Sequence, residues 1–404
     1  MIIKKICMLG CFTLLLSGCW NRTELNEIGI TSATGFDRTG NDWVATYQVI
    51  VPSSITSNTG GGSGSSQPAV NVFSSVGRTI SEAANLSNLE NPRRLYFAHN
   101  NVVVIGKEAM DQGINQLIDT YLRTAESRET VWLIVSDQKA GSILRKLIPP
   151  EKIPGTSIDQ ILRKEADNSS IFPPATIFDY ARTMKSDAKA IGIPIITVSG
   201  KGNTEKEKTL ETMDTYKEVS QANKLRLSGL AIIQNDRMVG RMNQHESRGL
   251  SWIINKVKGT VISISTSEQK REEPIALTIL TSKTKQHLVK SGDHYVMNIH
   301  VKAKANISES ESKLNLSKDT MVKQIEDQAG KDIKEEITAS WKIMQRLGTD
   351  LGGFADTVHQ KYPKHWQEIK DDWKNEFKKM ELNIHVKVII KRPGMLQNSF
   401  RNLD

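Results

Sequence analysis

The sequence contains very little cysteine. Its 404 residues include three cysteines, Cys7, Cys11 and Cys19, and all of them lie close to the N-terminus. If a signal peptide is removed in front of Cys19, that residue has no cysteine left to pair with, which excludes a framework of intramolecular disulfides. An exported protein with one remaining thiol must use that thiol for something else.

Long apolar runs are also missing. Residues 6–16 are almost entirely apolar, but a helix that spans a bilayer needs about 20 apolar residues. No later run is apolar enough to cross a membrane. Lys4 and Lys5 before a short apolar run, with small residues at its end, are typical of a secretory signal peptide. We therefore expect residues 1–18 to be such a peptide.

The end of this segment reads Leu-Ser-Gly-Cys, which is similar to the bacterial lipobox, Leu-(Ala/Ser)-(Gly/Ala)-Cys. The similarity implies cleavage between Gly18 and Cys19 and an S-diacylglyceryl group on Cys19. It also allows an N-acyl chain, such as palmitate, on the new amino terminus. Two acyl chains are enough for stable anchoring to a membrane. The alternative is an ordinary signal peptide that happens to be followed by a cysteine.

Motifs of catalysis and of nucleic-acid binding are absent from the sequence. There is no Gly-x-Ser-x-Gly elbow, and His245 does not begin a His-Glu-x-x-His motif. His300 and His385 are expected on solvated strand faces. The formal net charge is +9, but no basic cluster carries the interleaved aromatic residues of nucleic-acid binders. We therefore expect a non-enzymatic protein with no cofactor, no metal and no nucleic-acid partner.

Residues 19–150 predict an N-terminal α/β-type domain. Residues 28–36 and 43–51 flank an Asp/Gly/Asn-rich turn and are expected to form a hairpin. The Gly/Ser-rich residues 56–68 predict a flexible surface loop. Strand and helix patterns alternate from Val70 onward, with Asp137 expected to cap one of the helices, and this alternation indicates a mixed or parallel sheet.

A Pro/Gly-rich boundary near residue 150 predicts a smaller middle domain over residues 151–245. Within it, the polar stretch 201–223 is expected to be exposed. Residues 224–242 are expected to form a hairpin with its turn at Asn235-Asp236.

Residues 246–404 predict a C-terminal α+β domain. Residues 294–307 and 381–391 alternate between apolar and polar side chains, as strands with one solvated face do. Between them, apolar residues recur at every fourth position of a long helix: Met321, Ile325, Ala329, Ile333, Ile337 and Trp341. A second stripe follows Pro363, formed by Trp366, Ile369, Trp373 and Phe377, and core packing is favoured for it over partner docking. The fold class is therefore α+β, with three domains and mixed sheets that have helices packed on them.

Six stretches occur in a specific order along nearly the whole chain. They read GCWNRTELNEIG, ATGFD, LYFAHNNVVVIGKEAMDQGI, IDTYLRTAESRE, GLAIIQNDRMVGRMNQHESRGLSWI and YPKHWQEIKDDW. Together they resemble the Ger(x)C family, the C-subunit lipoproteins of spore germinant receptors. Asn21 departs from the pattern, because the family commonly has Asp after Cys-Trp.

The resemblance implies a three-domain protein on the outer surface of the spore inner membrane. It implies a complex with two integral-membrane subunits, one similar to amino-acid transporters. It further implies a role in detecting nutrients and triggering germination, with no enzymatic activity and no small-molecule ligand bound directly.

A solute-binding lipoprotein of a transporter is the alternative function. Such proteins usually have two similar doubly wound lobes with a ligand cleft between them, and they bind their nutrient alone. The final third of this sequence does not repeat the pattern of the first half. A lipid-anchored hydrolase is disfavoured because no nucleophile is evident.

Overall fold

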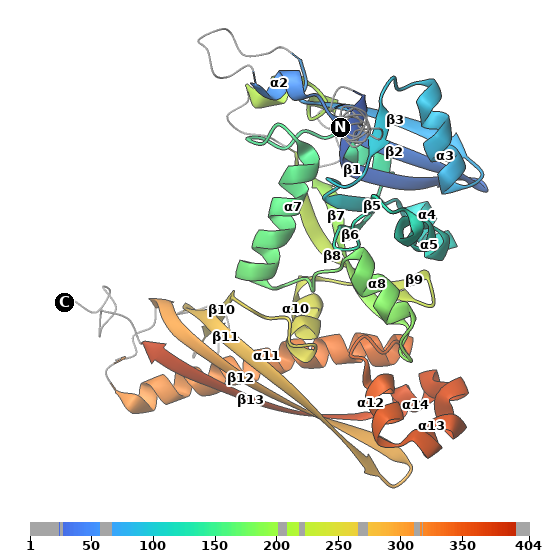
Figure 1. Ribbon diagram of the computed structural model, residues 1–404. Helices are drawn as coiled ribbons and strands as arrows, with labels where there is room; N and C mark the ends of the chain where they lie inside the picture. The colour runs from blue at the N-terminus through green and yellow to red at the C-terminus, as the bar shows by residue number, and fades with distance from the viewer. Residues whose placement is uncertain are drawn as a thin grey trace, which may run out of the picture.

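The computed structural model describes residue 24 and residues 27–56, 67–200, 208–217, 223–265, 274–310, 316 and 318–392 (Figure 1). The expected signal peptide, Cys19 and most of the expected Gly/Ser loop lie outside these residues. Figure 1 shows a large sheet in the upper half of the molecule and a smaller sheet in the lower half. Helix α10 (Gln244–Ile253) lies between the two sheets and contacts α11 (Asp319–Leu347), the long helix of the lower half.

The large sheet contains nine strands within the described residues. Eight follow the order β3-β2-β1-β5-β6-β7-β8-β9, and β4 pairs with the start of β1. Pairing is parallel from β1 through β5 and β6 to β7 and antiparallel toward both edges, which confirms the expected mixed sheet. The strands are β1 (Ile28–Thr39), β2 (Asp42–Ile50), β3 (Val70–Gly77), β4 (Arg94–Tyr96), β5 (Val102–Ile105), β6 (Trp132–Ser136), β7 (Ala190–Ser199), β8 (Lys224–Gln234) and β9 (Arg237–Met242).

The central strand β5 is buried on both of its faces. Val102 and Val104 point into one hydrophobic core, and Val103 and Ile105 point into a second core on the opposite face. This alternation follows from the period of two along a strand. The sheet is therefore covered on both sides by helices.

Helices α3, α4, α5 and α8 place their buried side chains in the second core, whereas α6 and α7 contribute to the first. The bounds are α2 (Pro52–Thr56), α3 (Ile80–Leu86), α4 (Lys107–Gln112), α5 (Asn115–Arg123), α6 (Ala140–Leu144), α7 (Pro154–Lys164) and α8 (Ile177–Met184), with the short helices η1 (Ser87–Leu89), η2 (Glu165–Ser169) and η3 (Met213–Tyr216).

Both expected hairpins of the large sheet are present. Strands β1 and β2 pair antiparallel around a turn in which Gly40 has a φ of 59°. Strands β8 and β9 pair around Asn235 and Asp236, whose φ values are 48° and 82°. Two successive positive φ values match the twist of the strands in a two-residue hairpin, and Asn and Asp tolerate this conformation better than most residues.

The large sheet runs through the position where a domain boundary was expected. Strand β6 precedes residue 150, and β7 follows it, yet the two strands are parallel neighbours in one sheet. A parallel pair requires a long crossover connection, and the Pro/Gly-rich segment lies within that crossover. The division of the chain into three domains stays a prediction.

Most described residues of the polar stretch at 201–223 are exposed, but some of them are buried. Residues 208–217 of this stretch are described, and Leu210 among them is only 2% exposed. The Lys146 ammonium, itself buried, lies 2.7 Å from a carboxylate oxygen of Glu211. The exposure of the whole stretch therefore stays a prediction, and the Lys146–Glu211 pair is a long-range contact that local polarity did not reveal.

The smaller sheet has the order β10-β11-β12-β13 within the described residues. Strands β11 and β12 form a long antiparallel hairpin, and β13 pairs with β12 in parallel. The helices between β12 and β13 supply the crossover that a parallel pair needs. The elements are β10 (Thr260–Ser265), β11 (Pro274–Ser291), β12 (His294–Ser310), β13 (Glu381–Arg392), α12 (Phe354–Lys361), α13 (Pro363–Ile369), η4 (Lys370–Asp372) and α14 (Trp373–Lys379).

The expected inward face of β12 is confirmed. The alternate residues that pack into the core are Tyr295, Met297, Ile299, Val301, Ala303, Ala305 and Ile307. On β13, Val388 is buried, and four further residues of the same face are half-buried against the core: Leu382, Ile384, Val386 and Ile390. The polar side chains between them are exposed.

The two helical stripes are also core, as expected. The stripe of α11 is buried from Ile325 to Trp341. The second stripe is interrupted by η4, but Trp366, Trp373 and Phe377 are buried on either side of it. Their rings contact one another, with the centroids of Trp366 and Trp373 5.3 Å apart. The aromatic stripe therefore fills the interior and is not free for a partner.

Candidate functional site at the junction of the two sheets

No group of three or more His, Cys, Asp and Glu side chains that could hold a metal ion occurs among the described residues. His300 and His385 lie on the exposed face of the smaller sheet, as expected, with their rings stacked 4.7 Å apart. Gly18 and Cys19 lie outside the described residues. No described helix has both the length and the apolar character to span a bilayer.

The last part of the stretch that ends in NQHESRGLSWI forms α10, the helix between the two sheets. Asn243 precedes this helix, and its side-chain oxygen accepts a hydrogen bond from the Glu246 backbone N–H at 3.0 Å. The Glu246 carboxylate in turn accepts from the Asn243 backbone N–H at 2.8 Å. This reciprocal capping box satisfies two donors that a helix start leaves free, so the HES sequence is part of a helix start.

Helices α10 and α11 approach each other very closely. A Cβ atom on Gly249 would lie 2.0 Å from the backbone oxygen of Glu336 and 2.9 Å from the Ser340 Cβ. Ser247 and Ser251 on α10 are fully buried as well. Small residues let two helix backbones come near enough for direct side-chain bonding between them.

A buried carboxylate joins these two helices. Glu336 of α11 is 4% exposed, and both of its carboxylate oxygens accept hydrogen bonds from the Arg248 Nε, at 2.9 and 3.0 Å. The Arg248 Nη2 also donates to Glu336. The Trp252 indole N–H, one turn later on α10, donates to the same carboxylate at 2.8 Å. A buried charge needs such partners, since a carboxylate without them would be strongly destabilising.

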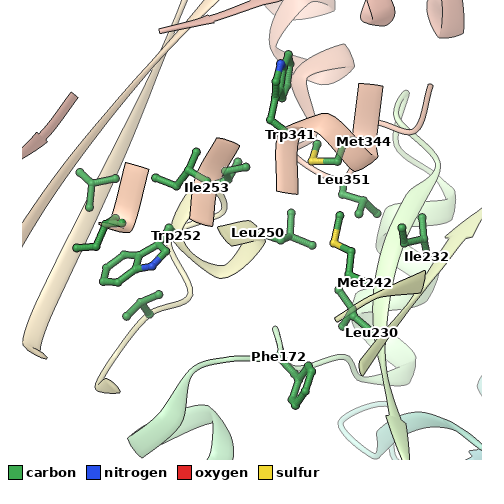
Figure 2. Packing of buried hydrophobic residues seen from close by; sticks show 14 of the residues in the cluster. Phe172, Leu230, Ile232, Met242, Leu250, Trp252, Ile253, Trp341, Met344 and Leu351 are labelled. Carbon is green, nitrogen blue, oxygen red and sulfur yellow. The ribbon is translucent and has the colours of Figure 1, made fainter. Parts of the chain in front are cut away.

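Apolar packing makes the junction continuous with both sheets. Figure 2 shows Leu250 of α10 close to Met242 of the large sheet and to Leu351 after α11. Trp341 and Met344 of α11 belong to the same core. This core also includes the inward face of β12 and residues of the large sheet, so the two sheets share one interior.

A second contact joins α12 to the segment that precedes β7. His359 Nδ1 lies 2.7 Å from a carboxylate oxygen of Asp187, and the Asp187 backbone N–H donates to Asp356 at 3.1 Å. The His359 ring stacks on Trp366 of the YPKHWQEIKDDW stretch, with centroids 5.6 Å apart. This stretch therefore also contributes to the junction.

Asp37, the last residue of ATGFD, caps a helix that is distant in sequence. Its carboxylate accepts hydrogen bonds from the backbone N–H groups of Ala140 and Gly141, at 2.8 and 3.0 Å. Burial raises the pKa of this carboxyl, whereas the two backbone donors act in the opposite direction. The expectation that Asp137 caps this helix is wrong. Asp137 instead accepts from the Thr197 hydroxyl at 2.7 Å, because the helix begins beyond its reach.

Asp236 of the β8–β9 turn has a similar role. Its carboxylate accepts from the backbone N–H groups of Ile114 and Asn115 at the start of α5, at 2.6 and 2.7 Å. The Tyr180 hydroxyl donates to the same oxygen at 2.9 Å. Burial, followed by the nearby Asp236 charge, raises the pKa of Tyr180. The described residues of these stretches thus supply helix caps and contacts between helices, and they form no recognisable catalytic arrangement.

Comparison with known proteins agrees with this arrangement. Residues 21–198 match the model described as "Spore germination protein N-terminal domain", and residues 228–394 match "Spore germination B3/ GerAC like, C-terminal". The chain belongs to the GerAC/GerKC family of spore germination proteins. The resemblance to germinant-receptor C subunits is thereby confirmed. This family has no known catalytic activity.

Relatives within this family match almost from end to end. The chain is 28% identical to "Spore germination protein KC" of Bacillus subtilis (strain 168), over 99% of each sequence. It is 22% identical to "Spore germination protein B3" of the same organism, over 95% of this chain and 96% of that protein. The crystal structure of the GerBC protein is similar in fold, with a TM-score of 0.55 at 18% identity, covering 89% of this chain and 97% of that one.

The expected fold class, α+β with mixed sheets and packed helices, is confirmed by this likeness. The two sheets differ in strand number and order, so they are not the two similar lobes expected of a solute-binding lipoprotein. Sequence reasoning did not single out Glu336, which lies among other charged residues of a long helix. One signal was available, since Glu336 lies three residues after Ile333 and four before Ser340, on the buried face of α11.

Proposed function

We propose that this chain is the C subunit of a nutrient germinant receptor and acts without catalysing a reaction. It is held by a lipid on Cys19 at the outer surface of the spore inner membrane. There it assembles with two integral-membrane subunits, one of them transporter-like, and the complex triggers germination when a nutrient is detected.

One observation carries this proposal. The N-terminal and C-terminal germination models match in order, and together they cover residues 21–198 and 228–394. A relative described as a spore germination protein matches 99% of the chain. The similarity to germination proteins therefore extends over both sheets and the junction, and is not limited to a single domain.

The junction supports a role in assembly. Because both sheets share one hydrophobic core and are joined by the Arg248–Glu336 pair, surfaces on the two halves keep a fixed relation to each other. A subunit that must contact two membrane proteins at once needs such a fixed relation, because loose domains lose binding free energy when they become ordered.

The short distance between Cys19 and the fold supports anchoring close to the membrane. Strand β1 begins at Ile28, nine residues after Cys19. Even when fully extended, nine residues reach about 30 Å. A lipid on Cys19 would therefore hold the large sheet near the bilayer surface.

Genetic complementation tests the function. The gene is deleted in its spore-forming host, together with the genes of related receptors, and is restored as wild type or as Cys19→Ala. Wild type should restore germination to one class of nutrients, measured as the fall in optical density of a spore suspension. Cys19→Ala should fail, and mass spectrometry should find no diacylglyceryl group on its N-terminal region.

The double variant Cys7→Ser/Cys11→Ser is the matched control. Both positions precede the expected cleavage site, so the mature protein and the germination response should be unchanged. A deletion strain that responds normally to every nutrient would contradict the receptor assignment. An unmodified Cys19 in a fully active wild-type protein would contradict the lipid anchor alone.

A further inference from the structure

Two adjacent rows of basic side chains cross the exposed face of the smaller sheet. Each row takes one residue from β11, one from β12 and one from β13, directly opposite one another in the register. All six side chains are exposed. We call them the cationic grid, and by row they are Lys285, His300 and His385, then Lys283, Lys302 and Lys387.

No carboxylate offsets the cationic grid within the sheet. The row before it consists of His287, Asn298 and Asn383, and the row after it of Thr281, Lys304 and Ile389. Among the described residues, the four lysines of the grid make no ion pair. Like charges placed directly opposite each other destabilise a sheet. The cationic grid therefore destabilises the protein when no ligand is bound. Such a local loss of stability is typical of functional sites.

The cationic grid lines one part of a hollow of about 770 Å³. That volume is in the range of small-molecule sites, about 300–1,000 Å³. Helix α11 lines another part with Lys323, Lys331 and Lys334. The whole lining holds seven lysines and two histidines against two carboxylates, Glu326 and Asp327. Of these lysines, Lys323 is already paired, with its ammonium 2.6 Å from Asp327.

Gly330 of α11 also lines the hollow. Glycine destabilises the interior of a helix relative to alanine. Close packing does not explain the glycine at this position, because a Cβ atom here would lie 3.6 Å from the Val386 oxygen and 4.0 Å from the Val386 Cβ, which are ordinary contacts. The missing side chain leaves space between α11 and β13.

We propose that this hollow binds a soluble multivalent anion, a compact molecule that carries two or more phosphate or carboxylate groups. Neighbouring strands lie about 4.8 Å apart, so the lysines of one row can each meet a different anionic group of one ligand. The bound anion removes the repulsion between the rows, and binding therefore also stabilises the smaller sheet.

A soluble ligand fits this site better than a membrane surface does. The grid lies in a hollow, whereas a layer of lipid headgroups presents a flat surface. In addition, β1 is the first strand after the proposed anchor in the sequence, and Figure 1 places it in the half of the molecule opposite to the smaller sheet.

Calorimetric titration of the full-length chain in detergent with sodium tripolyphosphate tests the site, in about 50 mM NaCl so that screening stays moderate. Wild type should bind in a saturable manner and melt at a higher temperature with the ligand. Lys302→Gln/Lys387→Gln should weaken binding by about tenfold, because two charge-assisted contacts are lost. Lys290→Gln/Lys304→Gln removes the same charge from the same hairpin outside the hollow, and should weaken binding by less than about threefold.

A third variant separates shape from charge. Gly330→Leu adds bulk to the hollow and leaves the net charge unchanged, so it should also weaken binding by about tenfold. Melting curves without ligand confirm that each variant is folded. Absence of saturable binding by wild type would overturn the proposal, as would equal losses for the two lysine pairs. Attachment to phosphatidylglycerol vesicles without tripolyphosphate binding would also overturn it, in favour of a membrane surface.

Discussion

Arg248 of α10 and Glu336 of α11 form a buried ion pair in which one guanidinium nitrogen is bonded to both carboxylate oxygens. Glu336 is 5% exposed at its side chain and Arg248 is 21% exposed. The pair lies where the helix of one half of the molecule meets the long helix of the other half. Its removal therefore tests how firmly the two halves are joined.

Arg248→Ala should lower the free energy of unfolding by roughly 3–5 kcal/mol, because it leaves the Glu336 carboxylate buried with only the Trp252 donor. Urea denaturation of the full-length chain in detergent measures this loss. The double variant Arg248→Ala/Glu336→Ala should lose less than the sum of the two single variants, since the residues interact directly.

Lys258→Ala is the control for this pair. It breaks an ion pair with Asp167 whose side chains are 70% and 59% exposed, and such surface pairs contribute at most about 1 kcal/mol. Equal losses for Arg248→Ala and Lys258→Ala would show that the junction does not depend on its buried pair.

Gly249→Ala should destabilise the protein, whereas Gly330→Ala should stabilise it, although both glycines lie within helices. The added methyl group at 249 would meet the Glu336 backbone at 2.0 Å and force α10 away from α11, at a cost of roughly 3 kcal/mol. At 330 the methyl group has room, and the better helix propensity contributes up to about 1 kcal/mol. Differential scanning calorimetry measures the change in melting temperature for each variant. Changes of the same sign would contradict the close contact between α10 and α11.

Asp350 should make stability depend on pH between about 4 and 6. Burial raises the pKa of this carboxyl from 3.8 to about 6, against the opposing effect of the Phe354 and Ala355 backbone donors. A raised carboxyl pKa means that the folded state holds the proton more tightly. The stabilising effect of the protonated Asp350 carboxyl is therefore complete below pH 4 and is lost as the pH rises through 6. Its loss lowers the free energy of unfolding by about 3 kcal/mol in total.

Asp350→Asn keeps an acceptor for the backbone donors and cannot ionise. The free energy of unfolding of wild type relative to this variant should therefore fall between pH 4 and pH 7, measured by urea denaturation at each pH. Asp319→Asn, at the exposed start of α11, should give a pH profile parallel to wild type. A parallel profile for Asp350→Asn as well would contradict the raised pKa.

Val388→Asp should unfold the smaller sheet, whereas Lys387→Ala should have little effect. Val388 is 3% exposed and packs into the shared core, so a carboxylate there is buried without a partner, at a cost of roughly 3–5 kcal/mol. Lys387 is exposed, and its loss should change stability by less than about 0.5 kcal/mol. Thermal melts followed by circular dichroism compare the two variants, and equal melting temperatures would contradict the assigned faces of β13.

Local pattern was enough to predict strands β12 and β13, both hairpins of the large sheet and the buried stripe of α11. Each of these depends on side-chain period or on turn residues that lie next to each other in the sequence, as with Asn235 and Asp236. The apolar alternation of residues 294–307 also gave the correct buried face of β12.

The features that could not be predicted depend on pairs of residues far apart in the chain. Asp137 looked like a helix cap because it is near α6 in sequence, but Asp37 reaches that helix from a neighbouring strand. Glu336 looked solvated because its neighbours in sequence are charged, and its partner Arg248 lies on another helix. Local composition near residue 150 also did not reveal that β6 and β7 are parallel neighbours, because that pairing is non-local.

The parallel pairing of β13 with β12 also determines when the protein can finish folding. Strand β13 is the last described element, and everything from α11 to α14 separates it from its partner. Contacts between residues so far apart in sequence form slowly, because the intervening chain must first lose its freedom. The large sheet is complete in sequence by Met242. The large sheet can therefore assemble before the smaller sheet is complete, and the edge of β12 stays open until β13 pairs with it.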